Sequence, residues 1–103
     1  MKGMNDMIRQ AQVMQRKMSE KQEELKTMVV EASSGGGMVT VKATCGQEIS
    51  EVIIEDSVLE SGDVEMLQDL VLTATNEALK KSKEVMEKEL SSITGGLNIP
   101  GMF

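Results

Sequence analysis

Apolar side chains recur every seven residues along the first quarter of the chain, in a stretch that contains no Gly or Pro. Two rows share this spacing: Met4, Ala11, Met18 and Leu25, and then Met7, Met14 and Met28, with Lys21 interrupting the second row. This heptad pattern predicts a helix over residues 4–28, roughly 37 Å long. A domain of this size cannot cover such a helix along its whole length. The Met rows are interpreted as a core or partner-facing seam, with a Met-rich surface for varied ligands as the alternative.

The pattern changes to strands between residues 29 and 60. Ser33 to Gly37 read as a turn or loop, and residues 38–45 then alternate, with one face made of Val39, Val41, Ala43 and Cys45. Gly46-Gln47 predicts a two-residue hairpin turn before a strand over residues 49–55, in which Val52-Ile53-Ile54 breaks the alternation. Residues 29–32 can add a first strand, so the meander has two or three antiparallel strands. Such a small sheet needs a covering helix or a second copy of itself.

A second long helix is predicted from about Asp63 to Ile93. Ser61 or Asp63 can cap its start, and Gly95-Gly96 ends it. Its first half is apolar and is expected to cover the sheet, whereas its second half carries more charge and is expected to be more exposed. The predicted fold is α+β, with a three-stranded antiparallel sheet between two long helices. We expect a single domain, 1–103, made of a helical arm (1–28), a sheet (29–60), a helix (61–94) and an irregular tail (95–103).

The composition excludes several classes of function. The chain has 103 residues, with no His, Tyr or Trp, one Phe, one Cys and ten Met. Without His or paired thiols, a catalytic or metal site has few candidate residues, and without aromatics base stacking is excluded. Cys45 is interpreted as a small apolar core residue, and the three glycines lack the Lys-Ser/Thr of a phosphate loop. We expect no enzyme activity, no cofactor, no metal and no small-molecule substrate.

The sequence also predicts the compartment. The first residues hold no apolar block of signal-peptide length, and no window reaches the roughly 18 apolar residues of a membrane span. A single thiol fits a reducing compartment. We therefore expect a cytoplasmic protein that does not contact a membrane.

The charge is unevenly distributed along the chain. The net charge is -6, which argues against a nucleic-acid partner. Residues 1–28 nevertheless carry six basic and four acidic side chains, a net charge of +2. Residues 29–62 have one basic and six acidic side chains, and residues 63–103 have four and seven. The first helix is therefore the one basic block of an acidic chain.

The cations of the first helix form a row of their own. Lys2, Arg9 and Arg16 are seven residues apart, on the predicted face opposite the Met seam, and Lys17 lies beside Arg16. Such a row can meet phosphates along a nucleic-acid backbone, and the alternative is a solvated helix surface with local ion pairs. In the last helix, Lys80-Lys81 and Lys83 form a second basic spot among several glutamates, for which a solvated surface is the favoured interpretation.

Several short segments, in the same order, resemble one known family. They are residues 7–18 (MIRQAQVMQRKM), 35–41 (GGGMVTV), 56–60 (DSVLE, a turn after the last strand), 65–71 (EMLQDLV), 76–78 (NEA) and 100–103 (PGMF). Together they span nearly the whole chain and resemble the YbaB/EbfC family of nucleoid-associated proteins.

This resemblance implies a bacterial cytoplasmic protein, associated with the nucleoid, that forms a homodimer through its sheet region with the long helices as projecting arms. It implies binding of double-stranded DNA with little sequence specificity, and an influence on nucleoid organisation and gene expression. The implied DNA-contact residues are Lys2, Arg9, Arg16 and Lys17, with Lys81, Lys83 and Lys88 as weaker candidates. Many members carry a basic pair before the position of Val52, where this chain has Ser50-Glu51.

A different class of function stays open beside it. The Met heptads can seat a partner helix, and the acidic sheet can meet a basic protein. On this alternative the chain is a protein–protein interaction module.

Overall fold

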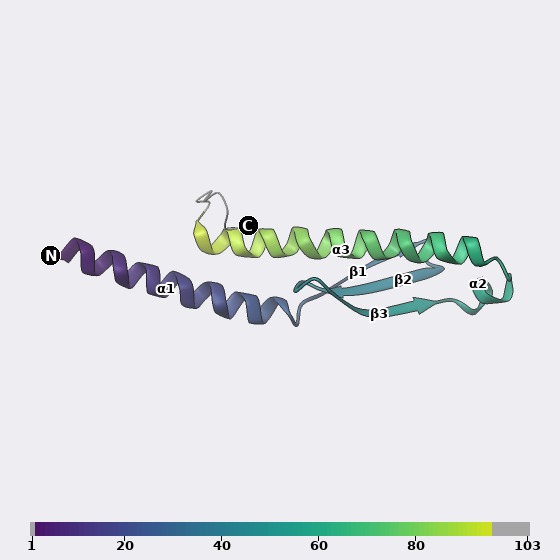
Figure 1. The fold of residues 1–103 in the computed structure, drawn as a ribbon, viewed down its shortest axis with the longest axis horizontal. Coiled ribbons are helices and arrows are strands. Elements are labelled where there is room, and N and C mark those ends of the chain that lie inside the picture. Colours follow the sequence, from purple (N-terminus) through teal and green to yellow (C-terminus); the bar gives the residue numbers. More distant parts are fainter. Residues whose placement is uncertain (1, 96–103) are drawn as a thin grey trace.

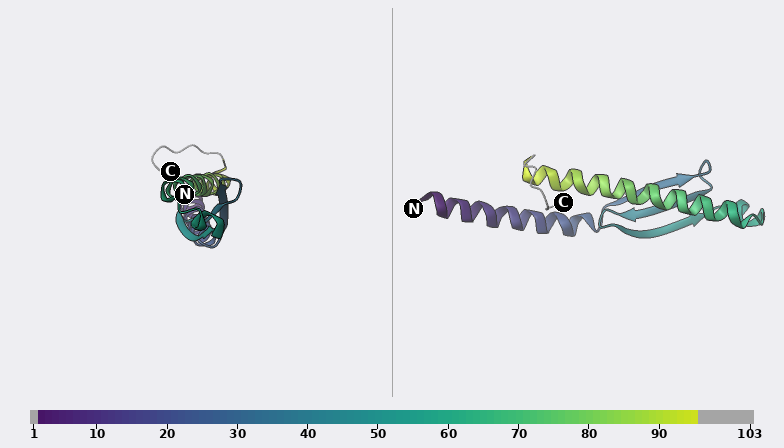
Figure 2. Two further views of the ribbon diagram at one scale, coloured as in Figure 1. Left: turned by 90° about the vertical axis from the view of Figure 1, so that its right-hand side faces the viewer. Right: turned by 45° about the horizontal axis from the view of Figure 1, so that its top comes forward.

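The protein is an elongated rod in which one long helix covers a sheet and then runs beside a second long helix (Figure 1). The computed structural model describes residues 2–95, with Lys2 described for its backbone only. The elements follow in the order α1 (Lys2–Leu25), β1 (Val29–Ser34), β2 (Val39–Thr44), β3 (Glu48–Ile54), α2 (Asp56–Glu60) and α3 (Val64–Thr94). The Cα positions extend over 72 × 22 × 16 Å. The end-on view in Figure 2 shows how narrow the rod is.

The predicted α+β class, with two long helices around a three-stranded antiparallel sheet, is confirmed. The helix α1 stops three residues before the predicted end, because Lys26 and Thr27 form a turn and the Met28 carbonyl accepts a hydrogen bond from the Cys45 amide at 2.8 Å. The segment 56–60, expected to be a turn, is the short helix α2. The expected irregular tail lies outside the described residues after Gly95.

The sheet has the order β1-β2-β3, and its register places three rows of side chains on the face that packs against α3. These rows are Val30, Ala43 and Ile49; Ala32, Val41 and Val52; and Ser34, Val39 and Ile54. The broken alternation in β3 has a physical explanation, since the pairing shifts at Lys42/Ala43 and leaves Ser50 without a partner. One extra residue reverses the direction of the side chains that follow, so this β-bulge brings Ile49 to the same face as Val52.

The two connections of the sheet differ in length from those that the sequence predicts. Ser33 and Ser34 belong to β1 rather than to the loop, and the Ser34 hydroxyl donates to the Leu70 carbonyl at 2.6 Å. The hairpin loop is Cys45 to Gln47, three residues instead of two, with Gln47 at a φ of 69°. A left-handed residue at the third loop position is typical of three-residue hairpins.

Two apolar clusters hold the rod together. In the larger one, Ala74 and Ala78 of α3 pack on Ala32, Val39, Val41 and Ala43 of the sheet, and their small side chains allow the helix to lie close to the strands. The second cluster joins Leu25, Cys45 and Leu90 at the point where α1, the hairpin loop and α3 meet. The predicted apolar role of Cys45 is therefore confirmed, since the residue is 1% exposed. Its burial, and then Glu89, raise the pKa of the thiol.

The second half of α3 is more buried than expected. Leu90 is 7% exposed and Thr94 is 3% exposed, because this half packs against α1 instead of facing solvent. Ser82 is fully buried between the two clusters, where its hydroxyl donates to the Thr44 carbonyl at 2.9 Å and accepts from Gln47 Nε2 at 2.7 Å. The predicted ends of α3 are confirmed, with the Asp63 carboxylate accepting from the Met66 amide at 3.0 Å and Gly95 at a φ of 65°.

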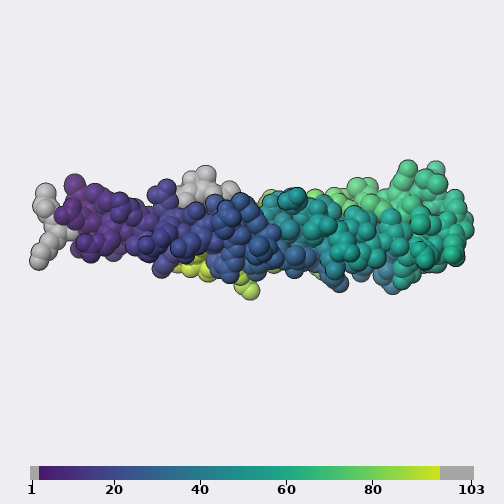
Figure 3. Space-filling model, turned by 90° about the horizontal axis from the view of Figure 1, so that it is seen from below, coloured from purple at the N-terminus to yellow at the C-terminus, as the bar shows by residue number. Residues whose placement is uncertain are grey.

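The N-terminal part of α1 projects beyond the end of α3 (Figures 1 and 2). The opposite face of the sheet carries no helix in the view of Figure 3, where α1 and the strands lie in front of α3. Among residues 2–95, no helix is both long and apolar enough to cross a membrane. The fold thus presents two surfaces, a projecting helical arm and an uncovered sheet face.

Candidate nucleic-acid interface

The cations of α1 do not all lie on one outer face. Arg16 is solvent-exposed, with its Nε 4.0 Å from Glu20 Oε1 across one helical turn. Exposed pairs of this kind contribute little, so the guanidinium can exchange Glu20 for another anion. Lys2 begins the helix, and its side chain lies outside the described residues.

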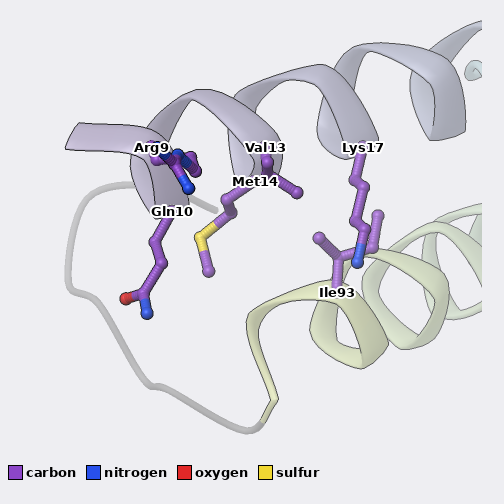
Figure 4. A pocket seen from close by; sticks show the side chains of 6 residues that line it. All are labelled: Arg9, Gln10, Val13, Met14, Lys17 and Ile93. Carbon is purple, nitrogen blue, oxygen red and sulfur yellow. The ribbon is translucent and has the colours of Figure 1, made fainter. Parts of the chain in front are cut away.

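Arg9 and Lys17 lie on the side of α1 that meets the end of α3. They line a groove of about 360 Å³, here called the Ile93 groove, with Gln10, Val13, Met14 and Ile93. Figure 4 shows Met14 directed from α1 toward the last turn of α3, with Lys17 beside Ile93 and Gln10 beyond the end of α3. The groove therefore has an apolar floor and a basic rim. The sequence predicted that Arg9 lies on the face of α1 opposite the Met seam. In the structure, α3 approaches α1 beside that seam, so that Arg9 lies at the edge of the contact between the two helices.

Lys21 joins α1 to α3 through an ion pair. The sequence shows this residue as an interruption of the Met row, but Lys21 Nζ lies 3.0 Å from Glu24 Oε2 and 3.1 Å from Glu89 Oε2. Glu24, and then Glu89, raise the pKa of the Lys21 ammonium. A raised pKa means that the ion pairs stabilise the fold below the ordinary lysine pKa of 10.5, and that this contribution is lost above it. The pair with Glu89 could not be predicted from the sequence, because Glu89 lies far from Lys21 along the chain.

The weaker candidates on α3 are separated from this groove. Lys81 Nζ donates to the Glu31 carbonyl at 3.0 Å, which directs the ammonium toward β1. Lys83 and Lys88 are exposed on α3. The structure thus brings Arg9 and Lys17 together in one groove, leaves Arg16 facing solvent and turns Lys81 to the sheet. Their roles in DNA contact stay predictions.

The apolar seam of α1 is only partly used inside the chain. Met18 and Leu25 pack in the second cluster, whereas Met4, Met7, Ile8 and Ala11 line an open groove of about 530 Å³. This last set, here called the arm stripe, includes side chains as exposed as Met7 at 70%. A stripe of this exposure on a small protein indicates a contact surface.

Residues 2–95 contain no group of three or more Cys, Asp or Glu placed to hold a metal ion. The sequence model of the YbaB/EbfC DNA-binding family matches residues 1–97. The chain belongs to this family.

Relatives in the family share most of the sequence. The chain is 55% identical over 102 residues to a nucleoid-associated protein of Acetivibrio thermocellus, covering 98% of this chain and 90% of that protein. It is 50% identical over 101 residues to a nucleoid-associated protein of Clostridium novyi, with 98% and 89% covered. The crystal structure of an uncharacterized protein from Helicobacter pylori matches with a TM-score of 0.74 and 29% identity, over 82% of this chain and 89% of that one. The resemblance seen in the sequence is confirmed.

Proposed function

We propose that the chain is a nucleoid-associated protein that binds duplex DNA as a homodimer, through backbone phosphates and with little sequence specificity. The observation that carries this proposal is that, in a chain of a DNA-binding family, the helix that projects from the rod is also the one basic block of the sequence. The names of the relatives support a location in the nucleoid.

Phosphate contact is the binding mode that this chemistry favours. Arg9 and Arg16 are seven residues apart on α1, which places them roughly 10 Å apart along the helix axis. Guanidinium groups suit phosphate oxygens because they offer several N–H donors in one plane. The single aromatic residue of the chain, Phe103, leaves no platform on which successive bases can stack. Contacts to phosphates carry no sequence information, so the expected specificity is low.

The strand that carries a basic pair in many members is unsuited to DNA contact in this chain. Ser50 forms the β-bulge, and Glu51 Oε1 lies 3.7 Å from Lys42 Nζ. A carboxylate at this position repels phosphates and occupies the nearest cation. The phosphate contacts therefore depend on the arms.

The sheet supplies the surface for the proposed homodimer. On β3, Val52 is 45% exposed and Ile53 is 43% exposed, and Val29 of β1 is 55% exposed. β3 is an edge strand, whose outer N–H and C=O groups have no partner strand within the described chain. Burying apolar edge residues against a second copy removes them from water and doubles the number of arms.

The test is a mobility-shift titration of a duplex with two double variants of equal charge. Arg9→Ala with Arg16→Ala removes two cations from the arm, whereas Lys42→Ala with Lys80→Ala removes one cation from the sheet and one from the exposed surface of α3. If each arm cation meets one phosphate, a dimer of the arm variant loses about four phosphate contacts. The slope of log affinity against log salt concentration should then become roughly 3 to 4 less negative. The control variant should keep most of the slope. Equal losses in both variants would show that only net charge matters and would refute the arm contacts.

A protein-interaction module is the second candidate, favoured by the exposed arm stripe. The same titration separates the two functions. A module has no measurable affinity for duplex at low salt, and Met7→Ser would weaken capture of its protein partner without changing the mobility of DNA.

A further inference from the structure

The Ile93 groove lies where α3 ends and α1 continues (Figure 4). Its apolar floor is formed by Val13, Met14 and Ile93. Gly95 ends the helix in a left-handed conformation two residues after Ile93. α3 therefore ends at the mouth of this groove.

The segment after Gly95 has the composition of a chain that packs on an apolar surface. Residues 96–103 read GLNIPGMF, and the sequence carries no charged side chain after Glu89. Four of these eight residues are large and apolar, namely Leu97, Ile99, Met102 and Phe103, the last being the one aromatic residue of the chain. Pro100 disfavours an extension of the helix. Because none of these side chains is charged, no ionised side chain loses its hydration when the segment enters a groove.

We propose that the segment 96–103 docks in the Ile93 groove of the same chain and covers the base of the projecting arm. Eight extended residues reach up to about 26–29 Å. From Lys17 to Arg9 the groove follows eight residues of α1, roughly 12 Å of helix. The segment can therefore run along the whole groove and still reach the arm stripe.

The tether favours this occupant over a second copy. A segment attached two residues from Ile93 has an effective concentration in the millimolar range, well above the micromolar concentration of another chain in a typical assay. The rim also suits an extended backbone, since the Gln10 amide can pair with peptide groups. The methylene stems of Arg9 and Lys17 can cover apolar side chains while their charged ends stay in water.

The experiment uses the full chain with two cysteine pairs that differ by two positions. Gln10 lines the Ile93 groove, whereas Gln12, equally a glutamine exposed on α1, lines a different groove with Arg16 and Glu20. Phe103→Cys is combined with Gln10→Cys in one protein and with Gln12→Cys in the other. Cys45 is 1% exposed and stays out of reach of the oxidant. Disulfide formation under mild oxidation is followed on non-reducing gels and by peptide mass mapping.

The expected result is an intrachain disulfide that forms at least ten times faster in the Gln10 pair than in the Gln12 pair. Equal rates would overturn the proposal, because a segment that visits both sides of α1 is not docked. A predominantly interchain disulfide would also overturn it, in favour of docking on a second copy.

Hydrogen exchange supplies a readout without engineered cysteines. In a variant that ends at Gly95, amides of residues 9–17 should exchange several-fold faster than in the full chain, while amides of β2 stay unchanged. The same exchange in both proteins would overturn the proposal. Neither experiment involves DNA, so this inference can fail or succeed independently of the proposed function.

Discussion

Replacing Leu25 by Ala tests the contact that fixes the direction of the arm. Leu25 is 2% exposed and packs with Cys45 and Leu90, at the only cluster of buried residues that includes α1 within residues 2–95. Three buried carbons at about 0.8 kcal/mol each give a transfer cost of about 2.4 kcal/mol. The remaining cavity adds to this cost, and the whole change should be about 3 kcal/mol, within the range for buried Leu→Ala substitutions.

The control is Leu72→Ala, the same change at a position of α3 that is 60% exposed. It should alter the free energy of unfolding by no more than about 0.5 kcal/mol. Both variants are measured by urea denaturation followed by circular dichroism, at one protein concentration so that any association contributes equally. A difference between the two variants below about 1 kcal/mol would refute the reasoning, because the second cluster would then not anchor the arm.

Three further predictions concern the loop, the thiol and the ion pair. Gly35→Ala should destabilise the fold by about 2–3 kcal/mol, because the backbone of Gly35 has a φ of +60° and an added Cβ would lie 2.7 Å from a methyl group of Leu70 in α3. Gly36→Ala, with a similar φ and open space around it, should cost about 1 kcal/mol in the same denaturation assay. Because burial raises its pKa, Cys45 should resist alkylation at pH 8 until urea unfolds the chain; rapid labelling of the folded protein would contradict this. Lys21→Gln should speed hydrogen exchange in the second half of α1 by removing the pair with Glu89, and unchanged exchange would exclude that role.

The sequence predicts the two long helices of this fold well because their signals are local. Asp63 caps α3, because its carboxylate accepts a hydrogen bond from the amide of Met66, three residues later. Gly95 ends the same helix in the left-handed conformation that glycine adopts easily. The inward face of β2 follows from strict alternation up to Cys45. Such features depend on neighbours within a few residues, so they can be read without knowing the tertiary contacts.

The features that the sequence does not predict depend on contacts across the chain. The bulge at Ser50 lets β3 pack both Ile49 and Ile54 on the core cluster under α3, a requirement visible only from the pairing with β2. Likewise, the burial of Leu90 and the position of Arg9 depend on the side from which α3 approaches α1. Heptad spacing identified the seam of α1 but could not decide which part of that seam stays open.

The most direct test of the central claim is the salt dependence of wild-type binding to two duplexes of unrelated sequence, measured by fluorescence anisotropy between 50 and 200 mM salt. If Arg9, Arg16 and Lys17 of two arms each meet a phosphate, the log–log slope should be about -5, and both duplexes should give the same affinity within about threefold. A slope near zero, or binding to one duplex only, would contradict arm-mediated binding to the phosphate backbone.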